Sequence, residues 1–180
     1  MPCYKVIMNI IVKEDKRWRV LYTKPRAEKR ALELLDKQRY HVYLPCTTVV
    51  KQWSDRKKKV SEPVFKSYIF INCIESEIFT ASHCPHVIGI VKFEGKPAIV
   101  RDEEMEAIRR IVAGNEEITV VNNREHLATG QRVNIISGNL KGLSGILTEF
   151  RGAQRLAIAI ESLGCNLLVE VAAHHAKPVL

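Results

Sequence analysis

The stretch that decides the fold is Trp18-Arg19-Val20-Leu21-Tyr22-Thr23-Lys24-Pro25-Arg26-Ala27-Glu28. Its first six residues alternate large apolar and polar side chains, and this two-residue period predicts a strand. Pro25 then favours the start of a helix, and apolar residues follow at helical spacing: Ala27, Ala31, Leu34 and Leu35. The fold therefore opens with a strand that runs directly into an amphipathic helix.

The segments that follow continue an α+β pattern up to residue 114. Strand-like runs are predicted at 41–44, 47–50 and 68–71, a short helix at 75–83, and a hairpin formed by 87–93 and 97–100. Asp102 is predicted to cap a further helix, because its acidic residues come early and its arginines come late. This order predicts one antiparallel sheet with flanking helices.

The last third of the chain has a different composition and residue pattern. Residues 115–127 are polar and predict a linker, whereas residues 128–180 hold six of the nine glycines, which separate short apolar runs. Such spacing is typical of a small β-barrel. We therefore predict an N-terminal extension at 1–16, an α+β domain at 17–114, the linker, and a barrel at 128–180.

Charge is concentrated in one part of the chain. The net charge is +8, and Lys and Arg outnumber Asp and Glu three to one within residues 16–66. One basic cluster runs from Lys16 to Arg30, and the other contains Lys51 and Arg56-Lys57-Lys58-Lys59. Such clusters attract polyanions, which indicates proximity to nucleic acid. The alternative is a solvated face, and charge alone does not separate DNA, RNA and an acidic protein surface.

Cysteine usage and the apolar runs narrow the class of protein further. The five cysteines are scattered without a C-x-x-C spacing, so neither a disulfide framework nor a zinc ribbon is expected. No run approaches the roughly 18–20 apolar residues of a membrane span. We expect a monomeric, cytoplasmic protein with no membrane contact.

No catalytic constellation is visible, so an enzyme is not expected. The cluster His83-Cys84-Pro85-His86 offers three potential metal ligands, but Pro85 breaks the helix that would align them and no second ligand pair accompanies it. The sequence also lacks a nucleophile elbow, a phosphate loop and a dinucleotide fingerprint. We therefore expect no metal and no cofactor.

Several segments, taken in order, resemble the NusG-type transcription factors. The match begins with the stretch 18–28, continues with Val60-Ser61-Glu62-Pro63-Val64-Phe65-Lys66-Ser67-Tyr68-Ile69-Phe70-Ile71, and includes Pro97–Val100. Gly130-Gln131-Arg132-Val133-Asn134-Ile135 and the glycines through Gly145 resemble a KOW motif. Residues Trp53–Lys59 are most similar to the RfaH/UpxY-type antiterminators, which act on particular operons such as those for surface polysaccharides.

The resemblance implies a NusG N-terminal domain, a flexible linker and an SH3-like KOW barrel. It implies a transcription elongation and antitermination factor whose first domain binds the clamp helices of RNA polymerase. Carried over by position, the contact residues are Tyr22, Phe65, Tyr68 and Phe70, with Thr80 facing the opposing polymerase lobe. The alternative for these aromatic residues is a place in the core, and Phe70 lies within a fully apolar strand.

The same resemblance implies contacts with nucleic acid. Lys24, Arg30, Lys37 and Gln38 match positions that face the non-template strand, and nascent RNA is the other candidate. Lys57, Lys58 and Lys59 are predicted at the tip of an excursion from the sheet, where they suit a phosphate contact. The alternative is a charged tip that only blocks edge pairing.

In the barrel, Leu140 and Leu143 match the surface that binds ribosomal protein or Rho. The alternative is that they close the open end of the barrel. We expect the C-terminal domain to be a permanent β-barrel, because its glycines oppose a helix, and we expect the polymerase site to be exposed. A second reading of the whole chain is an RNA- or ribosome-associated KOW protein, and a third is a catalytic protein using Cys84 and His86.

Overall fold

The computed structural model describes residues 15–52, 56–93, 95–114, 118–122, 130–150, 153–171 and 175–179. None of the helices in these ranges is long and apolar enough to cross a membrane. The elements of the first part are β1 (Arg17–Thr23), α1 (Glu28–Lys37), β2 (His41–Tyr43), β3 (Cys46–Gln52), β4 (Lys57–Pro63), β5 (Tyr68–Cys73), α2 (Glu75–Ala81), β6 (Val87–Ile90), β7 (Lys92–Phe93), β8 (Lys96–Pro97), β9 (Ile99–Val100) and α3 (Asp102–Ala113). Those of the second part are β10 (Ile118–Asn122), β11 (Gln131–Ile135), β12 (Ser144–Phe150), β13 (Ala153–Ile160), the short 3₁₀ helix η1 (Glu161–Leu163), β14 (Cys165–Glu170) and β15 (Ala176–Pro178).

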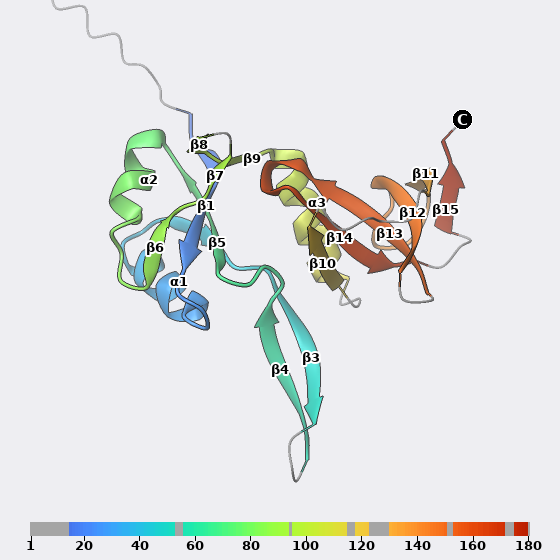
Figure 1. The fold of residues 1–180 in the computed structure, drawn as a ribbon, viewed down its shortest axis with the longest axis horizontal. Helices are drawn as coiled ribbons and strands as arrows, with labels where there is room; N and C mark the ends of the chain where they lie inside the picture. Colours follow the sequence, from blue (N-terminus) through green and yellow to red (C-terminus); the bar gives the residue numbers. More distant parts are fainter. Residues whose placement is uncertain are drawn as a thin grey trace, which may run out of the picture.

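The first part, from β1 to α3, forms the N-terminal domain around one antiparallel sheet. Its strand order is β2-β5-β1-β6, and β9 also pairs with β1 (Figure 1). The predicted first strand and helix are confirmed as β1 and α1, and β1 runs antiparallel to β5 from Arg17 opposite Cys73 to Tyr22 opposite Tyr68. The alternation read from the sequence sends Trp18 and Val20 to one face and Leu21 to the other.

The two faces of this sheet are covered by different partners. Helices α1 and α2 cover one face, where Ala31, Leu35 and Ile78 pack against Leu21 and its neighbours. Helix α3 covers the other face with Met105, Ile108 and Ile111, and beyond α3 lies the second sheet (Figure 1). Because α3 lies between the two sheets, its packing ties the N-terminal domain to the rest of the chain.

The hairpin of β3 and β4 projects away from the body of the N-terminal domain (Figure 1). Its two strands pair from Cys46 opposite Pro63 to Gln52 opposite Lys57. Lys57, Lys58 and Lys59 are the first three residues of β4, directly after the turn, so they lie near the far end of the projecting hairpin as predicted. Lysines are tolerated in this ladder because their side chains remain exposed to solvent.

The second part forms a six-stranded antiparallel sheet, called here the C-terminal sheet. Its order is β10-β14-β13-β12-β11-β15. The expected β structure is confirmed across the last third, where β13 and β14 flank only the short helix η1. Gly145 permits the close approach of β12 to β13, because a Cβ there would lie 2.5 Å from the carbonyl oxygen of Ala157.

The structure differs from the predicted linker at one place. Residues Ile118–Asn122, within the segment 115–127, form β10 and pair with β14 over their whole length. The run Ile118-Thr119-Val120-Val121 carries three β-branched apolar residues, which is a strand signal that the polar flanks obscured. The predicted hairpin at 87–100 is likewise shorter, since only β7 and β8 pair with each other.

Candidate functional site

The four predicted contact aromatics come together on the sheet face that α3 covers, but they form two pairs. Tyr22 and Tyr68 are register partners on β1 and β5, and their rings meet edge to face with centroids 5.9 Å apart. Phe65 and Phe70 form a similar pair at 5.4 Å. We call Tyr22 and Tyr68 the tyrosine pair.

Burial separates the two pairs. Tyr22 is 40% exposed and Tyr68 is half-buried, so the tyrosine pair can meet a partner. Phe65 is 4% exposed and Phe70 is fully buried, so their rings belong to the core. Phe65 is therefore not exposed in this arrangement, and its contact with a partner stays a prediction. Phe65 is buried because the C-terminal sheet and α3 complete an apolar cluster around it.

The turn between β4 and β5 positions these residues. Ser67 adopts φ +63°, in the left-handed region, and its backbone N–H donates to the Glu28 Oε1 atom at 2.8 Å. The Ser67 carbonyl oxygen accepts from the Thr23 N–H at 2.8 Å. These two bonds tie the turn to α1 and β1, which fixes Tyr68 beside Tyr22 and leaves Lys66 exposed next to them.

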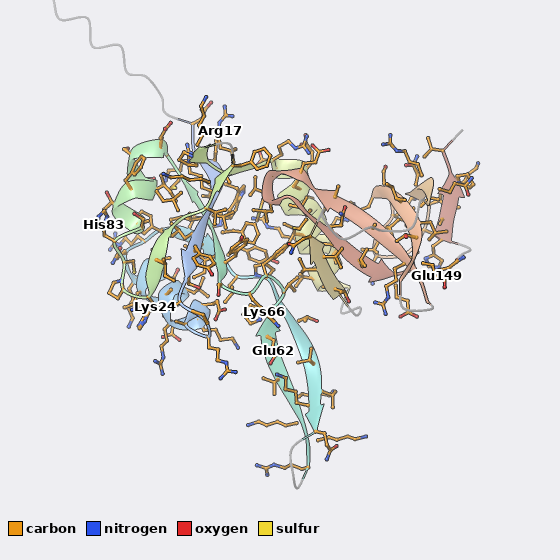
Figure 2. All side chains as sticks on the ribbon, viewed as in Figure 1. Arg17, Lys24, Glu62, Lys66, His83 and Glu149 are labelled. Carbon is orange, nitrogen blue, oxygen red and sulfur yellow. The ribbon has the colours of Figure 1, made fainter. Side chains whose placement is uncertain are left out.

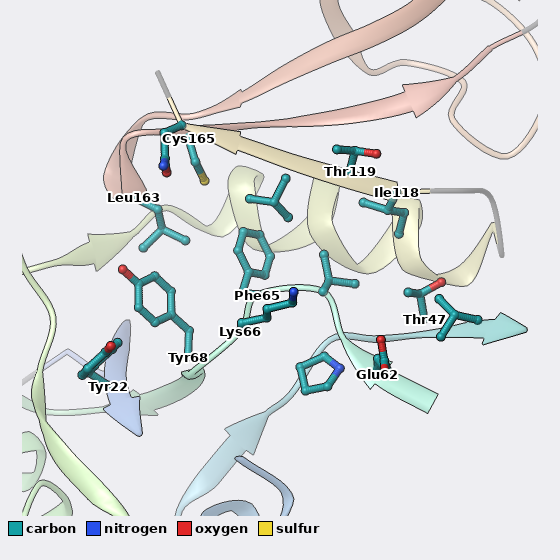
Figure 3. A pocket seen from close by; sticks show the side chains of 15 residues that line it. Tyr22, Thr47, Glu62, Phe65, Lys66, Tyr68, Ile118, Thr119, Leu163 and Cys165 are labelled. Carbon is teal, nitrogen blue, oxygen red and sulfur yellow. The ribbon is translucent and has the colours of Figure 1, made fainter. Parts of the chain in front are cut away.

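A groove of about 590 Å³ lies between the tyrosine pair and the C-terminal sheet. We call it the interdomain groove. Its N-terminal wall includes Tyr22, Phe65, Lys66 and Tyr68, and its opposite wall is formed by residues of β10, η1 and β14: Ile118, Thr119, Val120, Asn122, Leu163 and Cys165 (Figure 3). The expectation of a fully exposed site is therefore corrected, because the C-terminal sheet covers one side of it.

Burial raises the pKa values of two titratable side chains in the interdomain groove, those of Tyr68 and Cys165. Burial raises the pKa of the Tyr68 phenol, and nearby Cys165 and Tyr22 add to the rise. Burial also raises the pKa of the Cys165 thiol to about 11, with a further contribution from the Glu104 carboxylate. At neutral pH the Tyr68 and Cys165 side chains are therefore uncharged, and they lie beside the side chains of Lys66 and Glu62, which also line the groove.

Polar contacts hold α3 to the C-terminal sheet at both ends of the helix. At the first end, the Glu104 carboxylate accepts the Ser162 backbone N–H at 3.3 Å and the Arg101 guanidinium donates to Glu161 at 2.9 Å. At the other end, the Arg110 guanidinium donates to the carbonyl oxygens of Asn139, at 3.3 Å, and Lys141. Most of these bonds are made to main-chain atoms of η1 and the turn before β12.

The carboxylate of Glu104 is buried at this contact, with 5% of the side chain exposed. Burial by itself opposes ionisation, but hydrogen bonds from the backbone N–H groups of Arg101 and Ser162 outweigh it and lower the pKa of Glu104. The carboxylate is therefore ionised at neutral pH. Sequence reasoning missed this residue, since Glu104 reads as one of several acidic residues at a helix start.

The predicted nucleic-acid residues are exposed on α1 and its flanks and on the β3–β4 hairpin. Arg30 and Lys37 lie two turns apart on α1, and Gln38 follows them. Lys24 precedes the helix (Figure 2). Between α1 and the hairpin lies a second groove of about 480 Å³, whose lining includes Arg26, Lys29, Lys51 and Lys66. The Lys29 ammonium group donates to the Ser61 carbonyl oxygen at 2.9 Å and links the hairpin to α1.

The remaining predicted residues lie elsewhere. Thr80 is exposed on α2, on the opposite face of the sheet from the tyrosine pair. Leu140 is 4% exposed and Leu143 is half-buried, and both pack against the apolar cluster. The burial of Leu140 fits the alternative reading, in which the two leucines close the end of the barrel. It does not fit an exposed contact with a partner protein.

The histidine–cysteine cluster does not converge on a metal site. The His83 Nδ1 atom lies 2.8 Å from the Phe79 carbonyl oxygen, and Cys84 is buried in the core beneath α1 and α2. Within the part of the chain that the structure describes, no three His, Cys, Asp or Glu side chains are grouped to hold a metal ion.

Comparison with known proteins gives one family and one shared fold. The family described as "Transcription termination factor nusG" matches residues 16–109. The structure resembles that titled "Domain interaction in Thermotoga maritima NusG", with a TM-score of 0.58, 22% identity, and coverage of 92% of this chain and 98% of the other. The MjSpt4:Spt5 complex in conformation A gives a TM-score of 0.32 at 17% identity, covering 90% of this chain and 97% of the other.

Proposed function

Because the chain belongs to the NusG family of transcription factors, we propose that it is an elongation and antitermination factor whose N-terminal domain binds the clamp helices of RNA polymerase through the tyrosine pair. Members of this family are transcription factors rather than enzymes. The observation that carries the proposal is the tyrosine pair itself. It presents two amphipathic rings at the edge of the interdomain groove, and such aromatic anchors dominate small protein interfaces.

The proposed polymerase surface is partly covered by the C-terminal sheet. A helical hairpin seated on Tyr22 and Tyr68 would meet Leu163 and Cys165 on the other wall of the groove. Polymerase and the C-terminal sheet therefore compete for the same face of the N-terminal domain. Binding is accompanied by movement of the C-terminal sheet away from the tyrosine pair.

The basic side chains support the RfaH/UpxY-like subtype and its operon-specific action. Lys24, Arg30, Lys37 and Gln38 line the side of the domain that carries α1, and Lys57–Lys59 extend the charge along β4. This arrangement suits non-template DNA or nascent RNA at the cleft of the elongation complex. The C-terminal sheet, as a KOW barrel, would then recruit a ribosomal protein or Rho.

Replacing both Tyr22 and Tyr68 by alanine should weaken binding to purified RNA polymerase by about 100-fold or more, since each aromatic anchor contributes roughly 2 kcal/mol. The matched control is the double phenylalanine variant, which keeps both rings and should retain most of the affinity. Circular dichroism confirms the fold of each variant. Equal affinity of the alanine variant and the wild type would remove the tyrosine pair from the interface.

In vitro transcription over a long leader tests the function itself. The wild type should increase read-through of pauses and terminators, and the Tyr22→Ala/Tyr68→Ala variant should not. Recovery of ribosomal particles in place of polymerase in a stoichiometric pull-down would instead favour the RNA- or ribosome-associated reading.

Replacing Lys57, Lys58 and Lys59 by serine tests the nucleic-acid contact. Each neutralised phosphate contributes nearly one unit to the log–log slope of affinity against salt, so the slope for the elongation complex should flatten by about two to three units. Binding to polymerase without nucleic acid should not change, which serves as the control. Identical slopes for variant and wild type would mean that β4 does not touch nucleic acid.

A further inference from the structure

The second groove lies between the start of α1, the base of the β3–β4 hairpin and the turn that carries Lys66 and Ser67. We call it the basic groove. Its lining contains four cationic side chains and two carboxylates: Arg26, Lys29, Lys51, Lys66, Glu28 and Glu62. Four positive charges minus two negative charges give the lining a formal charge of +2. A groove with such a surplus concentrates anions.

Two of the four cations are already engaged, and their contacts hold the groove in shape. The Lys29 ammonium group donates to the Ser61 carbonyl oxygen at 2.9 Å. The Lys51 ammonium group pairs with the Glu62 carboxylate across the base of the hairpin. The first of these contacts joins the hairpin to α1, so the two walls of the basic groove are in place before any ligand binds.

The other two cations, Arg26 and Lys66, are available to a ligand. Both side chains are exposed, and within the described part of the chain neither makes a hydrogen bond or an ion pair. Arg26 belongs to the turn before α1, and Lys66 belongs to the turn before β5. An anion that enters the groove can therefore accept charge-assisted hydrogen bonds from two separate segments.

The backbone of both segments is fixed. Arg26 adopts φ +62° and Ser67, the neighbour of Lys66, adopts φ +63°, both in the left-handed region. The Ala27 N–H donates to the Lys24 carbonyl oxygen at 3.1 Å and closes the turn around Arg26. Because the two turns are ordered in advance, an anion bound between them orders little additional backbone.

The lining of the basic groove indicates which part of a polyanion it contacts. Among the described residues that line it, none is aromatic, whereas proteins that stack bases do so on aromatic rings. A strand in this groove is therefore held through its phosphates. A single strand bends into a groove of about 480 Å³, whereas duplex DNA, with a persistence length of about 50 nm, is too stiff to do so.

We propose that the basic groove binds the sugar–phosphate backbone of a single nucleic-acid strand through Arg26 and Lys66, independently of base sequence. The groove shares Glu62, Pro63 and Lys66 with the interdomain groove, so the strand lies beside the proposed polymerase surface (Figure 2). The place of the strand in an elongation complex rests on the proposed function, but the phosphate contact does not.

The first measurement uses the full chain without polymerase. Fluorescence anisotropy follows binding of a labelled oligothymidylate to the wild type and to Arg26→Asn/Lys66→Gln, in which asparagine tolerates the left-handed turn. Each neutralised phosphate of a single strand contributes about 0.7 units of log–log salt slope, so the slope should flatten by about 1.4 units. Over the decade from about 1 M to about 0.1 M salt, this difference equals a loss of affinity of about 25-fold.

The matched control removes two exposed lysines from another part of the N-terminal domain. Lys92→Gln/Lys96→Gln, in β7 and β8, should keep the wild-type slope. Circular dichroism confirms the fold of both variants. Equal slopes for Arg26→Asn/Lys66→Gln and the wild type would overturn the proposal, and so would a wild type that does not bind oligothymidylate.

Other ligands identify the group that is bound. The loss of affinity caused by Arg26→Asn/Lys66→Gln should be the same for oligoadenylate, since the groove has no ring to stack on a base. Inorganic phosphate at constant ionic strength should displace the oligonucleotide only weakly, because it lacks the neighbouring phosphates. Displacement by oligoglutamate as effective as by unlabelled oligothymidylate would indicate an acidic protein segment instead. That result, or an equal loss of affinity for a duplex, would overturn the proposal.

A comparison with the tyrosine pair separates this proposal from the proposed function. Tyr22→Ala/Tyr68→Ala should lose polymerase and keep the wild-type affinity for oligothymidylate. If this variant lost oligothymidylate as strongly as Arg26→Asn/Lys66→Gln does, the assignment to the basic groove would be wrong. A flattened salt slope for the groove variant, with no binding of the wild type to polymerase, would support the basic groove and contradict the proposed function.

Discussion

Replacing Phe65 by alanine should lower the free energy of unfolding by about 3–5 kcal/mol, the usual cost of removing a buried aromatic ring. Phe65 is 4% exposed, its ring stacks edge to face on Phe70, and the apolar cluster around it contains residues from both sheets. Removal of the ring therefore leaves a cavity at the boundary of the two parts of the protein. Urea unfolding followed by circular dichroism measures the change.

A phenylalanine on α2 provides the control for this substitution. Phe79 is 51% exposed, so Phe79→Ala should change the free energy of unfolding by no more than about 0.5 kcal/mol. Similar midpoints for the two variants would mean that Phe65 does not belong to the core, and would restore it as a surface contact.

Replacing Glu104 by alanine should destabilise the packing of α3 against the C-terminal sheet by about 2–4 kcal/mol. The reason is that the backbone N–H groups of Arg101 and Ser162 both lose their acceptor. Hydrogen exchange at the Ser162 amide measures the effect and should accelerate by about 30-fold or more. The neighbouring Glu103 is exposed, so Glu103→Ala is the matched control. Unchanged exchange at Ser162 would contradict the assigned contact.

The same carboxylate makes the contact sensitive to acid. The pKa of Glu104 lies below the ordinary value of 4.5 in the folded protein, so its contribution is complete above that value and is lost as the pH falls through the lowered pKa. Arg101, Glu161 and Cys165 are the other ionisable groups that face it. Below pH 4.5 the wild type should lose more stability than Glu104→Gln, whose amide does not titrate.

Local patterns were sufficient to predict the elements of the N-terminal domain. The alternation in residues 18–23 and the helical spacing after Pro25 gave β1 and α1, because both patterns reflect burial on one face of a single element. The glycine-rich last third likewise predicted strands. In each case the pattern is contained within the residues of the strand or helix that it predicts.

The arrangement of the two parts could not be predicted in this way. Whether Phe65 is buried depends on β14 and η1, about 100 residues away in sequence, and no local pattern encodes that contact. The contact of Glu104 with η1 and the burial of Leu140 could not be predicted for the same reason, since their partners belong to other segments. Strand β10 was missed because its four β-prone residues, Ile118–Val121, stand among polar neighbours.

The position of α3 between two sheets also bears on how the protein is made. The ribosome completes α3 at Ala113, but β14 is not complete until Glu170. At about 5–20 residues per second, the intervening chain takes roughly 3–11 s to synthesise. Throughout that interval the apolar surface that the C-terminal sheet later covers is open to other nascent chains. The strands of the C-terminal sheet, which are synthesised last, therefore cover an apolar surface of the N-terminal domain that would otherwise be free to aggregate.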